Sequence, residues 1–211
     1  ERMNGVENID EKNMTMTAWA GTPLQALQEA ALENNLYLPI DLGARGSCTI
    51  GGNIATNAGG TEVIRFGMTR SSVLGLEAVL ADGTIVSAMN RMIKNNSGYD
   101  LKHLFIGTEG TLGVVSRVVL QLQPRPISTH TALCALEDYG SVISVLNNLK
   151  LRLGGGLTGF ELMWANYFDG VIEMIPHLKN PFSKEHPFYL LLEYKDNDPV
   201  LGVERFEDAL F

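Results

Sequence analysis

A single uncharged stretch, GSCTIGGNIATNAGG at residues 46–60, constrains this chain more than any other feature. Five of its residues are glycine, and the polar residues between them are small. Glycine tolerates positive φ and lets a ligand approach the backbone closely, and successive backbone N–H groups form a concavity that suits phosphate oxygens. The stretch therefore has two interpretations: a lining for a pyrophosphate or a flat heterocycle, or a run of tight turns between strands.

A second glycine-rich segment, GTEGTLG at residues 107–113, favours the ligand interpretation. It has neither the G-x-G-x-x-G spacing of a dinucleotide fingerprint nor the G-K-[ST] ending of a P-loop. Its single carboxylate, Glu109, is expected to accept hydrogen bonds from ribose hydroxyls. A capped helical turn that leads into a strand is the structural alternative for the same residues.

The composition limits the class of protein. Of 211 residues, 45% are apolar, which is enough to bury one large core or two smaller ones. A net charge of −8 without a lysine-arginine cluster argues against nucleic acid as a partner. Cys48 and Cys134 show neither metal-ligand spacing nor a disulfide framework, which favours a reducing compartment. Because no signal peptide opens the sequence, we expect a cytoplasmic protein, or a matrix protein if the source is mitochondrial, and not a secreted one.

The remaining pattern predicts strands and helices in alternation. Thr22 is expected to cap a helix that has Pro23 at its first position, and Asp82-Gly83 is expected to turn a hairpin. The segment PRP at 124–126 is the expected domain boundary. Both ends look like cuts in a longer protein. Strands are expected at 14–20, 73–80, 84–88, 114–123, 128–136, near 156–162 and at 188–194, and helices at 23–33, 139–151, 164–174 and 198–211.

Four segments in register resemble the FAD-linked oxidases of the vanillyl-alcohol oxidase superfamily, and within it the D-2-hydroxyacid dehydrogenases, the group of D-lactate and D-2-hydroxyglutarate dehydrogenases. They are DLGARGSCTIGGNIATNAGG, VLGLEAVLADGT, NNSGYDLKHLFIGTEGTLGVVSRVVLQLQPRP and FELM, in that order. The resemblance runs from about residue 1 to residue 165 and weakens after that.

The resemblance implies an α+β fold with a mainly antiparallel sheet and flanking helices. Residues 1–126 would be the second subdomain of a PCMH-type FAD-binding domain. Residues 127–211 would begin a ferredoxin-like α+β substrate domain. The cofactor-binding residues that it implies are Pro39, Gly46, Ser47, Thr49, Ile50, Gly51, Gly52, Asn53, Thr56, Asn57 and Gly59 in the first stretch, and Gly107, Glu109, Gly110, Gly113 and Val115 in the second.

The implied reaction is hydride transfer from a small D-2-hydroxy acid to flavin, with a quinone or an electron-transfer protein as the electron acceptor. The family's catalytic and metal-binding residues would lie outside this sequence, so it is expected to contain none of them and to hold FAD weakly or not at all by itself. Self-association is left open. Two alternatives remain: an FAD-linked sugar oxidase or alkylglycerone-phosphate-synthase-like enzyme, and a non-catalytic nucleotide-binding module.

Other conspicuous residues are expected to be structural. The four histidines share no ligand spacing, and Cys48 is expected to be a small buried thiol. Asp100 is expected to cap a helix, and Glu161 to begin one. A group of three aromatic residues at one helical turn is expected to belong to the core, namely Trp164, Tyr167 and Phe168.

Overall fold

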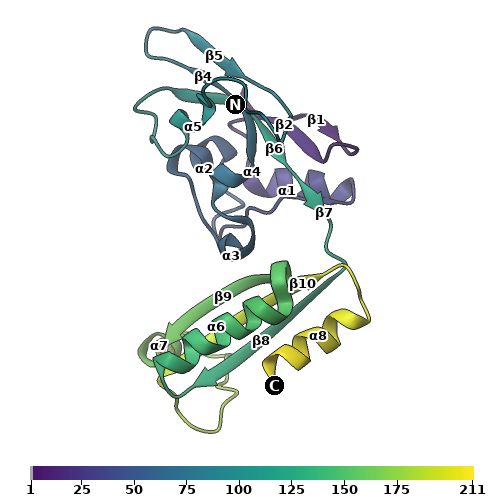
Figure 1. The fold of residues 1–211 in the computed structure, drawn as a ribbon. Coiled ribbons are helices and arrows are strands. Elements are labelled where there is room, and N and C mark those ends of the chain that lie inside the picture. The colour runs from purple at the N-terminus through teal and green to yellow at the C-terminus, as the bar shows by residue number, and fades with distance from the viewer. Residues whose placement is uncertain (1) are drawn as a thin grey trace. The chain divides into compact units, whose positions relative to one another are not determined.

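The computed structural model describes residues 2–211, which divide into two compact units. Unit 1 ends at Arg125, and unit 2 comprises Pro126–Phe211. The Pro-Arg-Pro segment at 124–126 lies at this junction. Antiparallel sheets with flanking helices make up both units (Figure 1), so the predicted α+β class is confirmed. Among the described residues, none of the helices combines the length and the apolar character needed to cross a bilayer.

Unit 1 is built on a five-stranded sheet in which every neighbouring pair is antiparallel. The central strand pairs on one side with the strand expected at 14–20. On the other side it pairs with the first strand of the hairpin expected around Asp82-Gly83. In spatial order the strands are β1 (Val6–Asp10), β2 (Thr15–Trp19), β6 (Val114–Gln121), β4 (Val73–Val79) and β5 (Ile85–Ala88).

Helices pack their apolar residues against this sheet. Leu24 and Leu27 of α1 (Leu24–Glu33) and Ile54 of α2 (Ile50–Thr56) join one buried core with Met16 and Leu120 of the sheet. Burial of each such leucine contributes about 2 kcal/mol to stability. Shorter elements complete the unit: β3 (Leu36–Tyr37), α3 (Val63–Phe66), α4 (Thr69–Ser72), α5 (Lys102–Phe105) and β7 (Gln123–Pro124), with β3 and β7 paired to each other.

Unit 2 is a three-stranded antiparallel sheet with helices on both faces. The strand order is β8 (Ser128–Leu136), β10 (Phe188–Asp196), β9 (Leu157–Trp164). Figure 1 shows α6 (Tyr139–Leu153) and α8 (Leu201–Leu210) next to each other, and both contact β8 and β10. Phe168 of α7 (Ala165–Met174) stacks on Tyr189 with 3.8 Å between ring centroids. Apart from α7 and the short 3-10 turn η1 (Gly154–Gly156), the order β-α-β-β-α follows the start of a ferredoxin-like motif.

Two predicted helix caps are wrong. The Thr22 hydroxyl donates to the carbonyl of Trp19 and does not cap α1, whose N-cap is Pro23. Asp100 does not cap α5, whose N-cap is Leu101; its carboxylate binds the ammonium of Lys102 instead. In both cases another hydrogen-bond partner, the Trp19 carbonyl or the Lys102 ammonium, binds the side chain that the local pattern assigns to the helix.

Two predictions for unit 2 also need correction. Glu161 lies within β9, opposite Leu191 of β10, and does not begin a helix. Trp164 and Tyr167 are 53% and 62% exposed, so only Phe168 of the aromatic group is in the core. α8, within the helix expected at 198–211, buries Phe206 and Ala209 beside Gly202.

Candidate functional site

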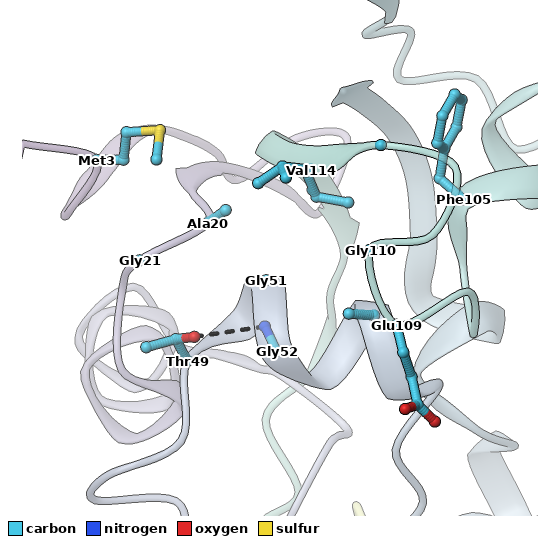
Figure 2. A pocket seen from close by; sticks show the side chains of 13 residues that line it. Met3, Ala20, Gly21, Thr49, Gly51, Gly52, Phe105, Glu109, Gly110 and Val114 are labelled. Atoms are coloured by element: carbon cyan, nitrogen blue, oxygen red, sulfur yellow. Dashed lines mark hydrogen bonds between the residues drawn. The ribbon is translucent and has the colours of Figure 1, made fainter. Parts of the chain in front are cut away.

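A pocket of about 330 Å³ in unit 1 brings the two glycine-rich segments together. One wall comes from the end of β2 and the start of α2, and the other from the loop after α5 and the start of β6 (Figure 2). The lining residues are Met3, Ala20, Gly21, Thr49, Gly51, Gly52, Ala55, Phe105, Glu109, Gly110, Gly113, Val114 and Val115.

Two backbone hydrogen bonds fasten the segments to each other. The N–H of Gly107 donates to the carbonyl of Ile54 at 3.0 Å, and the N–H of Glu109 donates to the carbonyl of Ala55 at 2.9 Å. Both acceptors lie near the C-terminal end of α2, and the Ile54 carbonyl also accepts from the N–H of the C-cap residue Asn57. Gly107 has a φ of +84° and Glu109 a φ of +52°, so the loop reaches these carbonyls through left-handed backbone.

The middle of the first glycine-rich stretch, Ile50–Thr56, forms the helix α2 rather than tight turns between strands. Thr49 is the N-cap of α2, and its hydroxyl accepts a hydrogen bond from the N–H of Gly52 at 3.3 Å. The N–H of Ile50 donates to the carbonyl of Thr22, and that of Gly51 to the carbonyl of Ala20. The amides of Ile50, Gly51 and Gly52 are therefore used within the protein.

The two glycines at the start of α2 have different physical roles. A Cβ on Gly51 would lie 2.8 Å from the Ala20 carbonyl oxygen, so Gly51 permits the close approach of α2 to β2. A Cβ on Gly52 would meet only the Thr49 hydroxyl at 3.5 Å. A Cβ on Gly110, across the pocket, would meet nothing within 4 Å. Gly52 and Gly110 thus present bare backbone to open space, as a ligand cradle requires.

Polar groups in the pocket are few and specific. Within the described residues, the N–H of Gly110 has no hydrogen-bond partner. The Thr49 hydroxyl accepts from Gly52 and keeps its own proton to donate. Apolar atoms of Val114 and Phe105 complete the walls. Such a surface suits a flat heterocycle with an oxygen-rich substituent.

Glu109 has a different placement from the one its sequence context suggests. It is an exposed residue on the rim of the pocket. Figure 2 shows its carboxylate extending away from Val114 and Phe105. Ribose recognition by Glu109 stays a prediction, and it would require the sugar to lie at the outer edge of the pocket.

The pocket contains Thr49, Gly51, Gly52, Glu109, Gly110, Gly113 and Val115 from the predicted set; the other predicted residues are not among its lining residues. Some support the helix or its neighbours: the Thr56 hydroxyl donates to the Gly52 carbonyl, and the Asn57 side chain accepts from the N–H of Arg70. The Nδ2 of buried Asn53 has no partner among the described residues. Their contacts with a cofactor stay predictions: Pro39, Gly46, Ser47, Ile50, Asn53, Thr56, Asn57, Gly59 and Gly107.

Sequence reasoning missed six lining residues: Met3, Ala20, Gly21, Ala55, Phe105 and Val114. Gly21 carried a signal, because it interrupts a predicted strand. A Cβ there would lie 2.4 Å from the Met3 carbonyl oxygen, so the strand end and the N-terminal segment can only meet at a glycine. The apolar residues carried no signal that distinguishes a pocket wall from a core.

The described part of the chain forms no metal site. Within residues 2–211, no three His, Cys, Asp or Glu side chains gather closely enough to hold an ion.

A family model described as "FAD binding domain" matches residues 1–89, which include β2, α2 and the first wall of the pocket. Residues 1–89 are thus similar to an FAD binding domain. The resemblance to FAD-linked oxidases is thereby confirmed.

Curated relatives extend the similarity over the whole chain. The sequence is 40% identical to D-2-hydroxyglutarate dehydrogenase, mitochondrial, of Arabidopsis thaliana over 208 residues, which are 99% of this chain and 37% of the relative. It is 40% identical to D-2-hydroxyglutarate dehydrogenase of Xanthomonas citri over 200 residues, which are 94% of this chain and 41% of the relative. The chain thus spans about two fifths of the length of these relatives.

Among solved structures, an alkyldihydroxyacetonephosphate synthase matches 99% of this chain and 40% of its own with a TM-score of 0.80. At 16% sequence identity this likeness shows the fold alone.

Proposed function

We propose that unit 1 binds FAD through the pocket between α2 and the loop at 107–113. The bare backbone of Gly52 and Gly110, on opposite walls, is the observation that carries the proposal. At 330 Å³ the pocket is at the small end of ligand sites and accommodates part of a dinucleotide. We therefore expect measurable but weak FAD binding by this chain alone.

Different groups of the chain would contact different parts of FAD. The N–H of Gly110 and the hydroxyl of Thr49 are the free donors for phosphate or carbonyl oxygens. The apolar walls at Val114 and Phe105 exclude water from one face of a ring. Gly51 acts indirectly, because it sets the distance between α2 and β2 and so the width of the pocket.

For the protein to which these residues belong, we propose oxidation of a small D-2-hydroxy acid of the D-2-hydroxyglutarate or D-lactate type. The relatives at 40% identity are named for that activity. Bound flavin would supply the hydride acceptor, and a quinone or an electron-transfer protein would reoxidise it. Unit 2 would begin the substrate domain. Several of these relatives are named as mitochondrial, so we propose a matrix location for a eukaryotic source.

The FAD proposal is tested by filling the pocket without unfolding the protein. In Gly52→Leu, the new side chain starts 3.5 Å from its nearest neighbour and projects into the pocket. We expect FAD affinity, measured by titration calorimetry, to fall about tenfold or more, equivalent to 1.4 kcal/mol. Because leucine is a better helix former than glycine, unfolding stability should stay equal or rise by about 0.5–1 kcal/mol.

Gly170→Leu is the matched control. Gly170 also lies in a helix, α7, and a Cβ there meets nothing within 4 Å. This variant should keep the FAD affinity of the original chain. Equal affinity in Gly52→Leu, or no saturable binding by the original chain, would exclude this pocket as the FAD site.

The substrate class is tested in the product of the complete reading frame that encodes this sequence. Anaerobic addition of D-2-hydroxyglutarate or D-lactate should bleach the flavin absorbance, and the L-enantiomers should not. Bleaching by a sugar and not by either D-2-hydroxy acid would contradict the proposed substrate class and leave the FAD site intact.

A further inference from the structure

A second cavity in unit 1, of about 250 Å³, shares no lining residue with the first. It lies between α4, the start of β4, the segment at 92–95 and α5. Its charged side chains are Arg70, Lys102 and Asp100, with His103 beside them. Apolar residues line the rest, among them Ile93.

Lys102 is the unusual member of this group, because its side chain is only 9% exposed. Its ammonium donates to both carboxylate oxygens of Asp100, at 2.7 and 2.6 Å. Within residues 2–211 these are the only hydrogen bonds of that ammonium, and Asp100 itself is half exposed. One N–H therefore remains unused at a buried charge, where a further acceptor is favourable.

Arg70 is fixed in place by the protein and still has donors to spare. Its Nη1 donates to the carbonyl of His103 at 2.8 Å and contacts Nδ1 of the same residue at 3.2 Å. Its Nη2 donates to the carbonyl of Ile106. A guanidinium has five N–H groups, so Nε–H and one Nη2–H are left. The carbonyls hold the guanidinium in position, which reduces the cost of ordering it around a ligand.

His103 adds no positive charge at neutral pH. A guanidinium cannot accept a hydrogen bond, so Nδ1 is the acceptor and the ring proton lies on Nε2, 3.5 Å from Asp100. Burial lowers the pKa of His103, as do the charges of Lys102 and Arg70, while Asp100 opposes them. The cavity thus carries two fixed cations and one carboxylate.

We propose that this cavity binds a small monocarboxylate with a short apolar tail. The carboxylate would sit between the ammonium of Lys102 and the guanidinium of Arg70, and the tail would contact the apolar wall near Ile93. The net charge of +1 matches a monoanion, and Asp100 disfavours a dianion such as phosphate. The volume excludes a dinucleotide, so this site is separate from the proposed FAD site.

The test uses butyrate as the probe and butyramide, its neutral isostere, as the ligand control. The chain is titrated with butyrate in the absence of FAD, and binding is monitored through amide NMR shifts. We expect saturable butyrate binding with shifts around Lys102 and Arg70. Inorganic phosphate should bind more weakly. In Lys102→Met, butyrate affinity should fall about tenfold or more, the cost of losing a charged hydrogen bond. Lys150→Met, which removes an exposed lysine of α6 in unit 2, should bind as the original chain does.

Equal binding of butyramide and butyrate would overturn the proposal, as would wild-type butyrate affinity in a folded Lys102→Met. No saturation by butyrate would also overturn it. Because FAD is absent from the titration, these outcomes say nothing about the pocket between α2 and the loop at 107–113.

Discussion

Three glycines of unit 1 each have a different structural role. Gly51 allows α2 to touch β2, Gly52 leaves the pocket open, and Gly110 contributes left-handed backbone and a free N–H. All three line the pocket, but only Gly52 and Gly110 have room for a Cβ on the side of a ligand. The density of glycines in the sequence therefore indicates where the site is. Only the contacts of each glycine show whether it serves packing or ligand binding.

At the residue scale, Asp196 makes unit 2 sensitive to acid. Burial raises the pKa of Asp196, but hydrogen bonds from Tyr194, from the backbone N–H of Asp198 and from Arg205 outweigh it and lower the pKa from 3.8 to about 2. The folded-state pKa lies below the unfolded one. The resulting stability, roughly 2 kcal/mol, is present above pH 4 and lost as the pH falls toward 2.

In Asp196→Asn, we expect lower stability at neutral pH and a flatter dependence of stability on pH between 4 and 2. Urea unfolding followed by NMR signals of unit 2 measures both. Asp208→Asn is the control, because within the described residues that carboxylate accepts no hydrogen bond. If the pH dependence of stability were unchanged in Asp196→Asn, the hydrogen bonds of Asp196 with Tyr194, Asp198 and Arg205 would not stabilise the fold.

At the element scale, periodicity predicted most strands and helices. The alternation in β6 and the Asp82-Gly83 turn located the central strand and its hairpin correctly. The four motifs in register gave the resemblance to FAD-linked oxidases that the family model supports, and they include the two segments that line the pocket. Alternation, turn residues and sequence motifs are each properties of a short stretch of sequence. They can therefore be recognised without knowing which distant residues they contact.

Features that depend on distant partners could not be read from local pattern. Thr22 has the right type and position for a helix cap, yet its hydroxyl accepts a hydrogen bond from the N–H of Gly5, 17 residues earlier in the chain. Ile50 lies among predicted contact residues but is fully buried in the core. The charge cluster of the second cavity joins α4 and α5, which are separated by a hairpin and a long loop.

The turn between α6 and β9 supplies an element-scale prediction. A Cβ on Gly156 would lie 2.1 Å from a ring carbon of Tyr194. That ring is buried and stacked on Phe206, so it cannot move aside. We expect Gly156→Ala to destabilise unit 2 by about 1–3 kcal/mol. Gly155→Ala, where a Cβ meets nothing within 4 Å, should change stability by less than about 0.5 kcal/mol. Equal unfolding midpoints in urea would contradict this account of the turn.

At the scale of the whole molecule, each unit has its own sheet and its own buried residues. The proposed FAD pocket and the proposed carboxylate cavity both lie in unit 1. Unit 2 supplies no residue to either. Binding of either ligand to this chain should therefore register in unit 1.

The central claim is that α2 and the loop at 107–113 hold part of FAD between them. Titration of the isotope-labelled chain with FAD, followed residue by residue through amide shifts, tests it most directly. We predict saturable shifts at Gly52, Gly110 and Gly113, and unchanged amides throughout Pro126–Phe211. Shifts that gather away from these glycines, or no saturable shifts at all, would contradict the claim.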